Sequence, residues 1–434
     1  MTKYIIDGGH ILRGDIKING SKNAALPILA ASILNKGITR ILNCPDISDV
    51  HIMCELLEEL GCIITFSTSK SIVEIDATQI NSSEILSSKT HKCRASVLLL
   101  GALLGRLGQA ELSYPGGCII GERPLDLHKT ALEAMGYEVY FTGDKIKSVV
   151  SSSHDVNTSR HVYLKFPSVG ATENALLAAA GLGCEVHIYG AATEPEIQSL
   201  GEYLILTGAN ISGLGTGHIT ISRTSAQEKP ILLYKNIPDR IEAATYMIMG
   251  AGLGEKLKIH GVNPTHIKSI VTVLRQMGCV IREINNSCSD CIYEISHSAS
   301  FKRLIAPELI IARPYPGFPT DAQSLIIPLL CISKGETIIC DNVFPQRFKA
   351  AYEMVKAGGN ITKKPYGILI SGRNKLHKAV LNSYDLRGGA AMITAGLFAE
   401  GQSTIYDNDY IKRGYVNLTQ TLRSVGAHIT EEPC

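Results

Sequence analysis

The 434-residue sequence predicts a two-domain α/β protein built from six copies of one structural unit. A glycine that follows a helix-like apolar run and precedes a strand-like run occurs six times, 68 to 80 residues apart, in segments such as LGCII, MGYEV and VGAHI. A second glycine lies 23 to 28 residues before each of them, in segments such as KGITRIL and LGCEVHI. The chain is also too long for one ordinary hydrophobic core, which favours two or three domains.

Each unit should contain a helix, a strand, a second helix and further strands. The first set of glycines should end helices in the left-handed conformation that a β-carbon disfavours; it consists of Gly61, Gly136, Gly208, Gly278, Gly358 and Gly426. The second set, before the strands, consists of Gly37, Gly108, Gly183, Gly254, Gly335 and Gly401. Six units divide into two domains of three, and NIPDRIEAA at 236–244 is a suitable junction.

The helical segments differ in the faces they bury. NAALPILAASILN and ENALLAAAGLG are apolar nearly all round, so we expect buried helices there. VHIMCELLEELG is more amphipathic and should cover a surface. GLGTG at 213–217 lacks the spacing of a dinucleotide-binding loop and predicts a turn.

Composition excludes several classes of protein. Lys and Arg number 42 against 40 Asp and Glu, so no overall positive charge points to nucleic acid. The N-terminal residues lack the apolar core of a signal peptide, and no apolar run approaches the roughly 20 residues of a membrane span. The 12 cysteines are scattered through apolar contexts such as LGCII, which predicts reduced core residues in a cytoplasmic protein.

Familiar catalytic motifs are absent from the sequence. It contains no Walker A loop, no H-E-x-x-H and no G-x-S-x-G. Cys288 and Cys291 form one C-x-x-C, but no second ligand pair follows at zinc spacing, so a hairpin turn is the preferred interpretation over a metal site.

Several charged residues lie in small or turn-forming contexts instead. Each cation taken alone is ordinarily a solvated surface residue, but together these cations could converge on phosphate or carboxylate groups. The guanidinium group of arginine forms two parallel hydrogen bonds with such anions. The cations are Lys22, Arg94, Arg123, Arg347, Arg387 and Arg413. Asp321, in FPTDAQ, is either a helix N-cap or a base held on a rigid turn. Cys118, in YPGGCIIGERPLDLH, is displayed in a glycine-rich segment rather than in an apolar strand or helix.

Taken in order, these motifs resemble a known enzyme family. SKNAALP, PGGCIIGERPLDLH, FPSVGATENALLAAA, PDRIEAATY, FPTDAQ, FPQRF, DLRGG and RGY occur in the order found in the UDP-N-acetylglucosamine enolpyruvyl transferases of peptidoglycan synthesis. The resemblance runs from about residue 6 to the C-terminus. The related shikimate-pathway transferases share the fold but lack the cysteine loop.

The resemblance implies two inside-out α/β barrels, each of three βαβαββ units. One domain should span residues 21–235 and carry the Cys118 loop as a mobile lid. The other should combine residues 1–20 with 236–434, and ligands should bind in the cleft between them. It implies a monomer or weak oligomer.

The implied reaction transfers enolpyruvate from phosphoenolpyruvate to the 3-hydroxyl of UDP-N-acetylglucosamine and releases phosphate, with no cofactor and no metal. By motif match, Cys118 protonates C3 of phosphoenolpyruvate, and Asp321 is the base for the hydroxyl. The residues matched to the phosphoenolpyruvate side are Lys22, Arg123, Arg387 and Arg413, and those matched to the cleft or the sugar nucleotide are Asn23, Arg94, Pro124, Asp126, Leu127, Ser168, Val169, Gly170, Val343, Arg347 and Asp385.

The chain departs from the family pattern at a few positions. Ser21 and Gly388 each stand where alanine is usual, and Val416 stands where glutamate is common. Tyr410 and Lys412 replace a His-Ile-Asp context before RGY. Two other functions remain open at this point, namely transfer to a different nucleotide acceptor and non-catalytic binding of the sugar nucleotide by a regulator.

Overall fold

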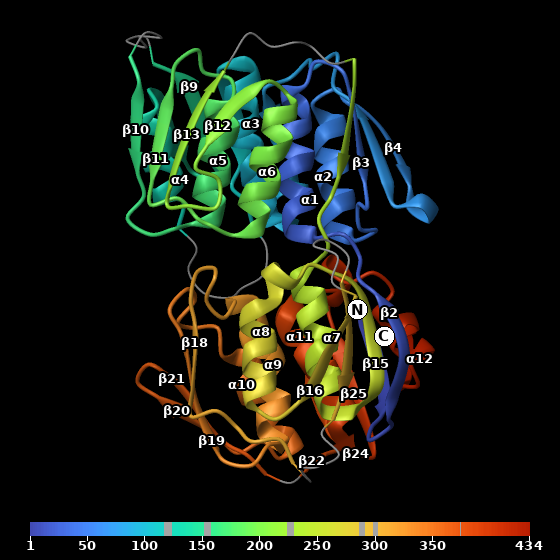
Figure 1. Cartoon of the computed structure of the whole chain (residues 1–434). Helices are drawn as coiled ribbons and strands as arrows, with labels where there is room; N and C mark the ends of the chain where they lie inside the picture. The colour runs from blue at the N-terminus through green and yellow to red at the C-terminus, as the bar shows by residue number, and fades with distance from the viewer. Residues whose placement is uncertain (117–123, 152–157, 224–229, 286–290, 298–302, 374) are drawn as a thin grey trace. The chain divides into compact units, whose positions relative to one another are not determined.

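The computed structural model describes the chain except for residues 117–123, 152–157, 224–229, 286–290, 298–302 and 374. It divides into two compact units (Figure 1). Unit 1 combines Met1–Asn19 with the described residues of Pro238–Cys434, and unit 2 contains the described residues from Gly20 to Ile237.

Unit 2 contains three four-stranded sheets. The first has the order β14 (Ile231–Lys235), β3 (Ile38–Leu42), β5 (Ile72–Asp76) and β4 (Ile63–Ser67). The second has the order β6 (Glu84–Ile85), β7 (Gln109–Ser113), β9 (Lys145–Val150) and β8 (Tyr137–Thr142). The third has the order β10 (Arg160–Tyr163), β11 (Val186–Tyr189), β13 (His218–Arg223) and β12 (Ala209–Ser212).

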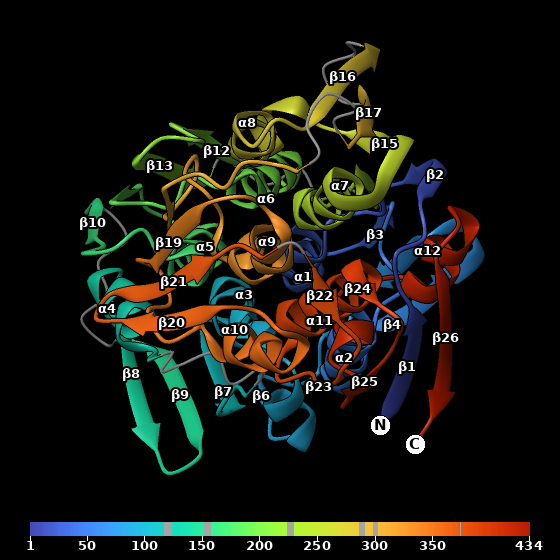
Figure 2. The ribbon, with the colours of Figure 1, turned by 90° about the horizontal axis from the view of Figure 1, so that it is seen from below.

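Unit 1 repeats this arrangement. Its first sheet has the order β2 (Leu12–Lys17), β15 (Gly254–Val262), β17 (Cys291–Ser296) and β16 (Val280–Asn285). The second has the order β18 (Leu309–Ala312), β19 (Glu336–Asp341), β21 (Gly367–Ser371) and β20 (Ile361–Lys364). The third has the order β23 (Val380–Asn382), β25 (Gln402–Asp407), β1 (Thr2–Asp7) and β26 (His428–Pro433). A short pair, β22 (Leu376–His377) and β24 (Ala399–Glu400), lies beside the last of them (Figure 2).

All six sheets have one topology. An edge strand pairs in parallel with its neighbour, and an antiparallel hairpin completes the sheet. Three sheets are completed by distant segments, because β14 returns to pair with β3, β2 pairs with β15, and the N-terminal β1 lies between β25 and β26 in place of a hairpin strand. The six predicted repeats therefore appear as six sheets of one pattern.

Three nearly fully buried helices form the middle of each unit. In unit 2 they are α1 (Lys22–Ala31), α3 (Leu98–Leu107) and α5 (Val169–Ala179), and in unit 1 they are α7 (Arg240–Leu253), α9 (Thr320–Ile332) and α11 (Leu386–Phe398). Helix α3 packs on α1 and α5, and α9 packs on α7 and α11, so the strands of unit 1 surround a helical core (Figure 2). The buried helices predicted from NAALPILAASILN and ENALLAAAGLG are confirmed.

A second set of helices lies closer to the surface. They are α2 (Ser48–Glu59), α4 (Asp126–Ala134) and α6 (Pro195–Leu206) in unit 2, and α8 (Lys268–Gln276), α10 (Lys349–Met354) and α12 (Leu418–Ser424) in unit 1. Helix α2 has one buried face and one exposed face, as the amphipathic pattern predicts. In the described part of the chain no helix is both long and apolar enough to cross a bilayer.

The glycine markers behave differently in the two sets. All six glycines of the first set have a positive φ, between 89° and 100°, which confirms the predicted left-handed helix ends. In the second set only Gly108, Gly335 and Gly401 have a positive φ, while Gly254 has φ −73° and continues into β15.

GLGTG forms the turn between β12 and β13, as expected. The ten described cysteines are all free thiols, and eight of them are buried.

Candidate active site

Asp321 lies in the first turn of α9, immediately after the FPT segment. Its Oδ1 accepts a hydrogen bond from Arg347 Nη1 at 2.7 Å, and its Oδ2 lies 3.4 Å from Arg387 Nε. One carboxylate is therefore shared by two guanidinium groups that come from separate parts of unit 1. Asp321 is not the N-cap, because Pro319 occupies that position.

Asp385 caps the neighbouring helix α11. Its Oδ1 accepts the backbone N–H groups of Arg387 and Gly388, both at 3.0 Å, and lies 3.8 Å from Arg347 Nη2. A β-carbon at Gly388 would lie 2.9 Å from Asp385 Oδ2. The glycine that replaces the usual alanine therefore leaves room for this carboxylate.

The loop after β19 is fastened to α9 by Asp341, a residue for which the sequence suggested no role. Thr320 donates a hydrogen bond from Oγ1 to Asp341 Oδ2 at 2.6 Å. Asp341 Oδ1 accepts the N–H groups of Val343 and Phe344 at 2.9 and 2.8 Å. This pairing positions Val343, and Arg347 beyond it, relative to Asp321.

The two arginines of this site are buried cations. The side chains of Arg347 and Arg387 are 5% and 2% exposed, against 27% for Asp321. Burial disfavours the ionised form of Asp321, but the attraction of Arg347 and Arg387 outweighs it and holds the pKa of this carboxyl well below its usual range. Within the described residues, Arg347 Nε and Arg387 Nη1 have no hydrogen-bond acceptor. Buried N–H donors of a cation are costly to leave unpaired, so the site is suited to an acidic ligand.

Tyr415 forms the other side of this cluster. Arg387 lies over its ring, with the guanidinium carbon 5.3 Å from the ring centroid, and its hydroxyl lies 2.8 Å from Thr245 Oγ1. Arg413 is half-buried at the end of the 3₁₀ helix Ile411–Arg413, two residues before Tyr415. Lys412 is directed to the sheet instead, with Nζ 2.8 Å from Glu431 Oε1 of β26.

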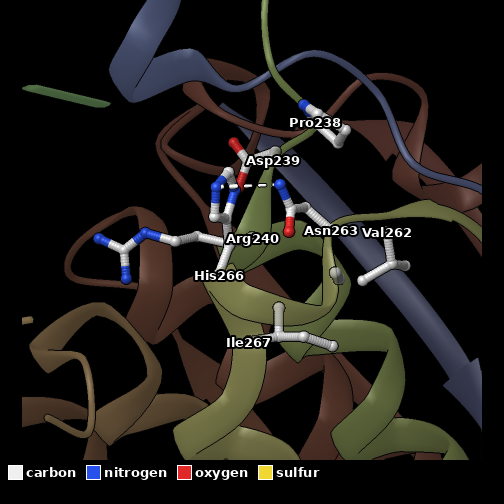
Figure 3. A pocket seen from close by; sticks show the side chains of 8 residues that line it. Pro238, Asp239, Arg240, Val262, Asn263, His266 and Ile267 are labelled. Atoms are coloured by element: carbon white, nitrogen blue, oxygen red, sulfur yellow. Dashed lines mark hydrogen bonds between the residues drawn. The ribbon is translucent and has the colours of Figure 1, made fainter. Parts of the chain in front are cut away.

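The PDRIE segment begins α7, and its residues Pro238, Asp239 and Arg240 line a shallow surface hollow. Figure 3 shows Asp239 at its rim and the hydrogen bond of 3.1 Å between Asn263 and His266 across it. Asp239 caps α7 by accepting the N–H groups of Ile241 and Glu242 at 2.8 and 2.9 Å. Its neighbour Glu242 is buried, and burial, followed by the charge of Asp239, raises the pKa of Glu242 to about 8.

In unit 2, Lys22 forms a buried ion pair at the start of α1. Its Nζ lies 2.7 Å from Asp49 Oδ2, and the two side chains are 10% and 3% exposed. Ser21, which replaces the usual alanine, is the N-cap of α1, and its Oγ accepts the N–H of Ala24 at 3.3 Å. Asn23 is half-buried beside Lys22.

The first turn of α5 carries Ser168, Val169 and Gly170, all half-buried. Gly170 lies against the His128 ring of α4, because a β-carbon there would be 3.1 Å from it. His128 Nδ1 is 2.8 Å from Asn174 Nδ2 of α5, and Asn174 also accepts the N–H of Gly101 in α3 at 2.8 Å. His128 and Asn174 stand inside the quoted DLH and TEN motifs, so the motifs marked them without indicating their role.

The predicted residues thus fall into two groups, one in each unit. Arg94 begins the 3₁₀ helix that leads into α3, and donates from Nη1 to Pro115 O at 3.2 Å. Pro124 and Asp126 are exposed at the start of α4, and Leu127 is half-buried there. Cys118 and Arg123 lie outside the described residues.

Comparison with known proteins gives the family. Residues 6–422 match the family described as EPSP synthase (3-phosphoshikimate 1-carboxyvinyltransferase). UDP-N-acetylglucosamine 1-carboxyvinyltransferase 2 of Caldanaerobacter subterraneus subsp. tengcongensis is 38% identical over 433 residues, covering 99% of each chain. UDP-N-acetylglucosamine 1-carboxyvinyltransferase of Clostridium botulinum is 39% identical over 430 residues, again covering 99% of each.

Solved structures confirm the predicted fold class. The enolpyruvyl transferase NikO from Streptomyces tendae has a TM-score of 0.87 at 22% identity, covering 100% of this chain and 99% of that one. EPSP synthase from Acinetobacter baumannii has a TM-score of 0.74 at 16% identity, with complete coverage of both chains. The chain therefore belongs to the UDP-N-acetylglucosamine 1-carboxyvinyltransferase family, within the wider group that the EPSP synthase family describes.

Proposed function

We propose that this chain transfers the enolpyruvyl group of phosphoenolpyruvate to the 3-hydroxyl of UDP-N-acetylglucosamine and releases phosphate. Relatives that bear the name of this activity match it along almost their whole length. Units 1 and 2 act as the two domains of the enzyme, with boundaries near residues 21 and 236.

The observation that carries this proposal is the pair of buried arginines beside Asp321. Arg347 Nε and Arg387 Nη1 lack acceptors among the described residues, although both side chains are almost fully buried. A substrate with a phosphate and a carboxylate supplies the acidic oxygens that such donors require. Phosphoenolpyruvate carries both groups.

Asp321 takes the proton of the sugar hydroxyl as the hydroxyl oxygen attacks C2 of phosphoenolpyruvate. A carboxylate held so strongly in its ionised form by two arginines is a weak base. An anionic substrate that draws Arg347 or Arg387 away from Asp321 raises the pKa of Asp321 at the moment when it must accept a proton. Substrate binding and base activation are thereby coupled through the same guanidinium groups.

The remaining steps rest on the sequence motifs. Cys118 gives a proton to C3, which completes the tetrahedral adduct. C3 then loses a proton, the bond between C2 and the phosphate oxygen breaks, and phosphate departs with the electron pair. Arg123, Lys22 and Arg413 balance the charge of the phosphate and carboxylate, where cations placed beforehand stabilise a transition state most.

Unit 2 supplies the nucleotide side of the site. The N-terminal turn of α5, with Ser168 to Gly170, presents backbone N–H groups and the positive end of the helix dipole, and both suit a diphosphate. The packing of α4 on α5 through His128 and Asn174 brings Asp126 and Leu127 to the same end of the unit. These residues, with Asn23 and Arg94, form the acceptor site; Val343 and Asp385 contribute from unit 1.

Two further properties complete the proposal. The buried free thiols suit a reducing compartment, and we place the enzyme in the bacterial cytoplasm. It acts as a monomer or weak oligomer.

The test is steady-state phosphate release from phosphoenolpyruvate with a panel of acceptors. We expect release with UDP-N-acetylglucosamine and none with UMP, or with either substrate alone. Cys118→Ala should abolish release while the thermal unfolding midpoint stays within a few degrees of the parent. Release with UMP but not with the sugar nucleotide would overturn the acceptor, and a fully active Cys118→Ala would overturn the acid.

A further inference from the structure

A group of metal-ligating side chains lies in unit 1, formed by the two chain ends and apart from the residues discussed so far. Asp7 ends the N-terminal strand β1, and His428 begins the C-terminal strand β26. The two are direct partners in the antiparallel register. His10 follows in the loop after β1, and one ligand atom from each of the three side chains lies within 4.8 Å of the other two.

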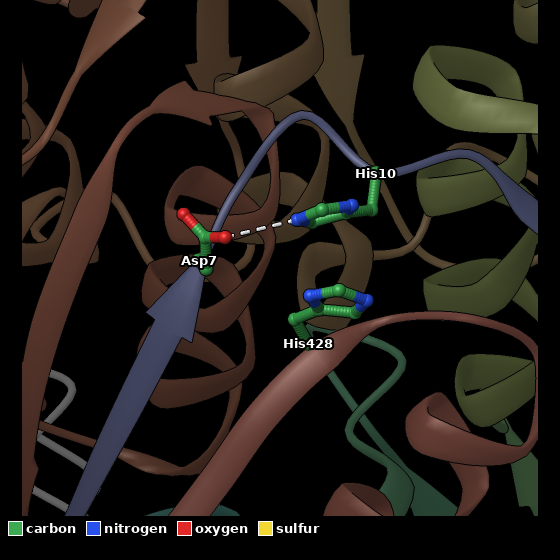
Figure 4. A group of neighbouring side chains, drawn as sticks. All are labelled: Asp7, His10 and His428. Carbon is green, nitrogen blue, oxygen red and sulfur yellow. Dashed lines mark hydrogen bonds and ion pairs between the residues drawn. The ribbon is translucent and has the colours of Figure 1, made fainter.

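The three side chains already face one another. The rings of His10 and His428 are stacked, with centroids 3.6 Å apart and planes inclined by 22°. His10 Nε2 lies 3.0 Å from Asp7 Oδ2. Figure 4 shows the two rings one above the other with Asp7 beside them, at the edge of the sheet. Asp7 and His428 are exposed and His10 is half-buried, so an ion has access from solvent.

The backbone fixes this arrangement. The loop that returns His10 over β1 is Gly8-Gly9, and Gly9 has φ +83°. A β-carbon at Gly8 would lie 2.2 Å from the carbonyl oxygen of Ala399, so only glycine allows the loop to approach so closely. Gly9 N–H donates to Leu397 O at 2.8 Å, which anchors the loop to the end of α11. The ligands therefore stand on an ordered strand pair and a tethered turn, as a preorganised site requires.

The donor set selects the class of ion. Two imidazole nitrogens with one carboxylate oxygen suit zinc and its neighbours in the first transition row, whereas magnesium and calcium prefer oxygen ligands alone. Bonds of about 2.0–2.1 Å in a tetrahedral zinc site place ligand atoms about 3.4 Å apart. The ligand atoms lie within 4.8 Å of one another and the two imidazole rings are stacked, so the side chains must rotate before all three reach one ion, and a water molecule takes the fourth position.

We propose that Asp7, His10 and His428 form a zinc-type divalent metal site that ties the N-terminal strand to the C-terminal strand. The ion replaces the proton shared between His10 and Asp7 and links β1, its following loop and β26. Because a ligand that binds only the folded chain stabilises it, zinc should raise the stability of unit 1. The role is distinct from enolpyruvyl transfer, since none of the three residues belongs to the proposed active site.

The test is zinc titration of the full-length chain, free of any affinity tag, by isothermal calorimetry, with cobalt absorption to identify the ligand type. We expect one equivalent of zinc, with the dissociation constant raised at least tenfold in both His10→Ala and His428→Ala. Zinc should raise the thermal unfolding midpoint of the parent and leave that of the two variants unchanged. Phosphate release should be the same in all of them.

The matched control is His260→Ala. His260 Nε2 pairs with Asp15 Oδ1 at 2.6 Å in the same unit, and within the described residues no third ligand joins that pair. This variant should bind zinc as the parent does. The proposal fails if the parent binds no zinc, if all four proteins bind it equally, or if the cobalt spectrum shows thiolate ligands only.

Discussion

Each unit buries one prominent charge cluster at the start of an inner helix, and the two clusters are built differently. In unit 2, Lys22 and Asp49 form an ion pair at 2.7 Å, with both side chains at most 10% exposed. In unit 1, Asp321 is 27% exposed and is divided between Arg347 and Arg387 at 2.7 and 3.4 Å. One cluster centres on a single short ion pair, and the other is a network in which Arg347 Nε and Arg387 Nη1 have no acceptor among the described residues.

The two arrangements should differ in their contribution to stability and in their capacity to bind a substrate anion. Breaking a buried pair leaves one charge stranded, which is strongly destabilising. In the network, Arg347 keeps Asp385 at 3.8 Å and Arg387 keeps the face of Tyr415, so the loss of one contact leaves each cation partly compensated. The network can therefore exchange an internal carboxylate for a substrate anion at a small cost, whereas in unit 2 the Asp49 carboxylate holds the Lys22 ammonium group in place at the start of α1.

The largest expected effect comes from removing the charge at the centre of the network. Asp321→Asn keeps the shape of the side chain but cannot take a proton from the hydroxyl, so kcat should fall by about 10²–10⁴-fold. The chain should remain folded, because both arginines retain other partners. Phosphate-release kinetics and thermal unfolding of the same preparation measure the two quantities. If Asp321→Asn keeps its activity but unfolds at a much lower temperature, then Asp321 contributes to stability and is not the base.

The pair should give the largest loss of stability. Asp49→Asn removes the anionic group that lies 2.7 Å from the buried Lys22 Nζ and should lower the free energy of unfolding by about 3–5 kcal/mol. The double variant Lys22→Met with Asp49→Leu removes both charges and should recover much of that loss, because a well-packed apolar pair often replaces a buried ion pair without penalty. Urea unfolding of the parent, the single and the double variant measures this. Equal stability of the single variant and the parent would show that the pair contributes nothing.

Local sequence patterns predicted the repeat and the buried helices α1 and α5, because these features depend on neighbouring residues. The six helix-ending glycines all adopt the predicted backbone, since a left-handed residue at a helix end is a local requirement. The completion of the last sheet of unit 1 by β1 was beyond such reasoning. It joins residues from 395 positions apart (Asp7 and Gln402) to 431 positions apart (Thr2 and Pro433), and no local pattern encodes that pairing.

The site was predictable to the extent that motifs marked it. Asp321, Arg347, Arg387 and Asp385 come together in one cluster, yet only the family resemblance had grouped them. Asp49 was missed because an aspartate in the first turn of a helix is ordinary there and gives no sign of a lysine partner 27 residues away.

A third prediction contrasts Asp321 with another buried carboxyl of unit 1. Burial raises the pKa of Glu242 to about 8, so the folded chain holds this proton more tightly than the unfolded chain, whose ordinary value is 4.5. Its stabilising contribution is complete below about pH 4.5 and is lost as the pH rises to about 8. One pKa unit corresponds to about 1.4 kcal/mol, so the loss should reach a few kcal/mol.

Glu242→Gln is the matched variant for this effect. Glutamine keeps a carbonyl that can accept one of the two hydrogen bonds from Asn19, and it does not titrate. The difference in unfolding free energy between parent and variant, measured by urea unfolding from pH 5 to pH 9, should change steadily in favour of the variant. A difference that stays constant across this range would mean that Glu242 does not titrate in the folded chain.

The smallest effects are expected from substituting the two serine N-caps of unit 2. Ser21 and Ser168 accept the N–H groups of Ala24 and Ala171 at 3.3 and 3.4 Å, so each alanine substitution should cost about 1 kcal/mol of stability. Their functions should differ. Ser21→Ala restores the residue usual in the family and should leave the KM for UDP-N-acetylglucosamine unchanged, whereas Ser168→Ala should raise it severalfold, because the first turn of α5 binds the nucleotide. If both variants raise the KM equally, the Ser21 hydroxyl takes part in the acceptor site beside Asn23, and the contrast between the two serine caps no longer holds.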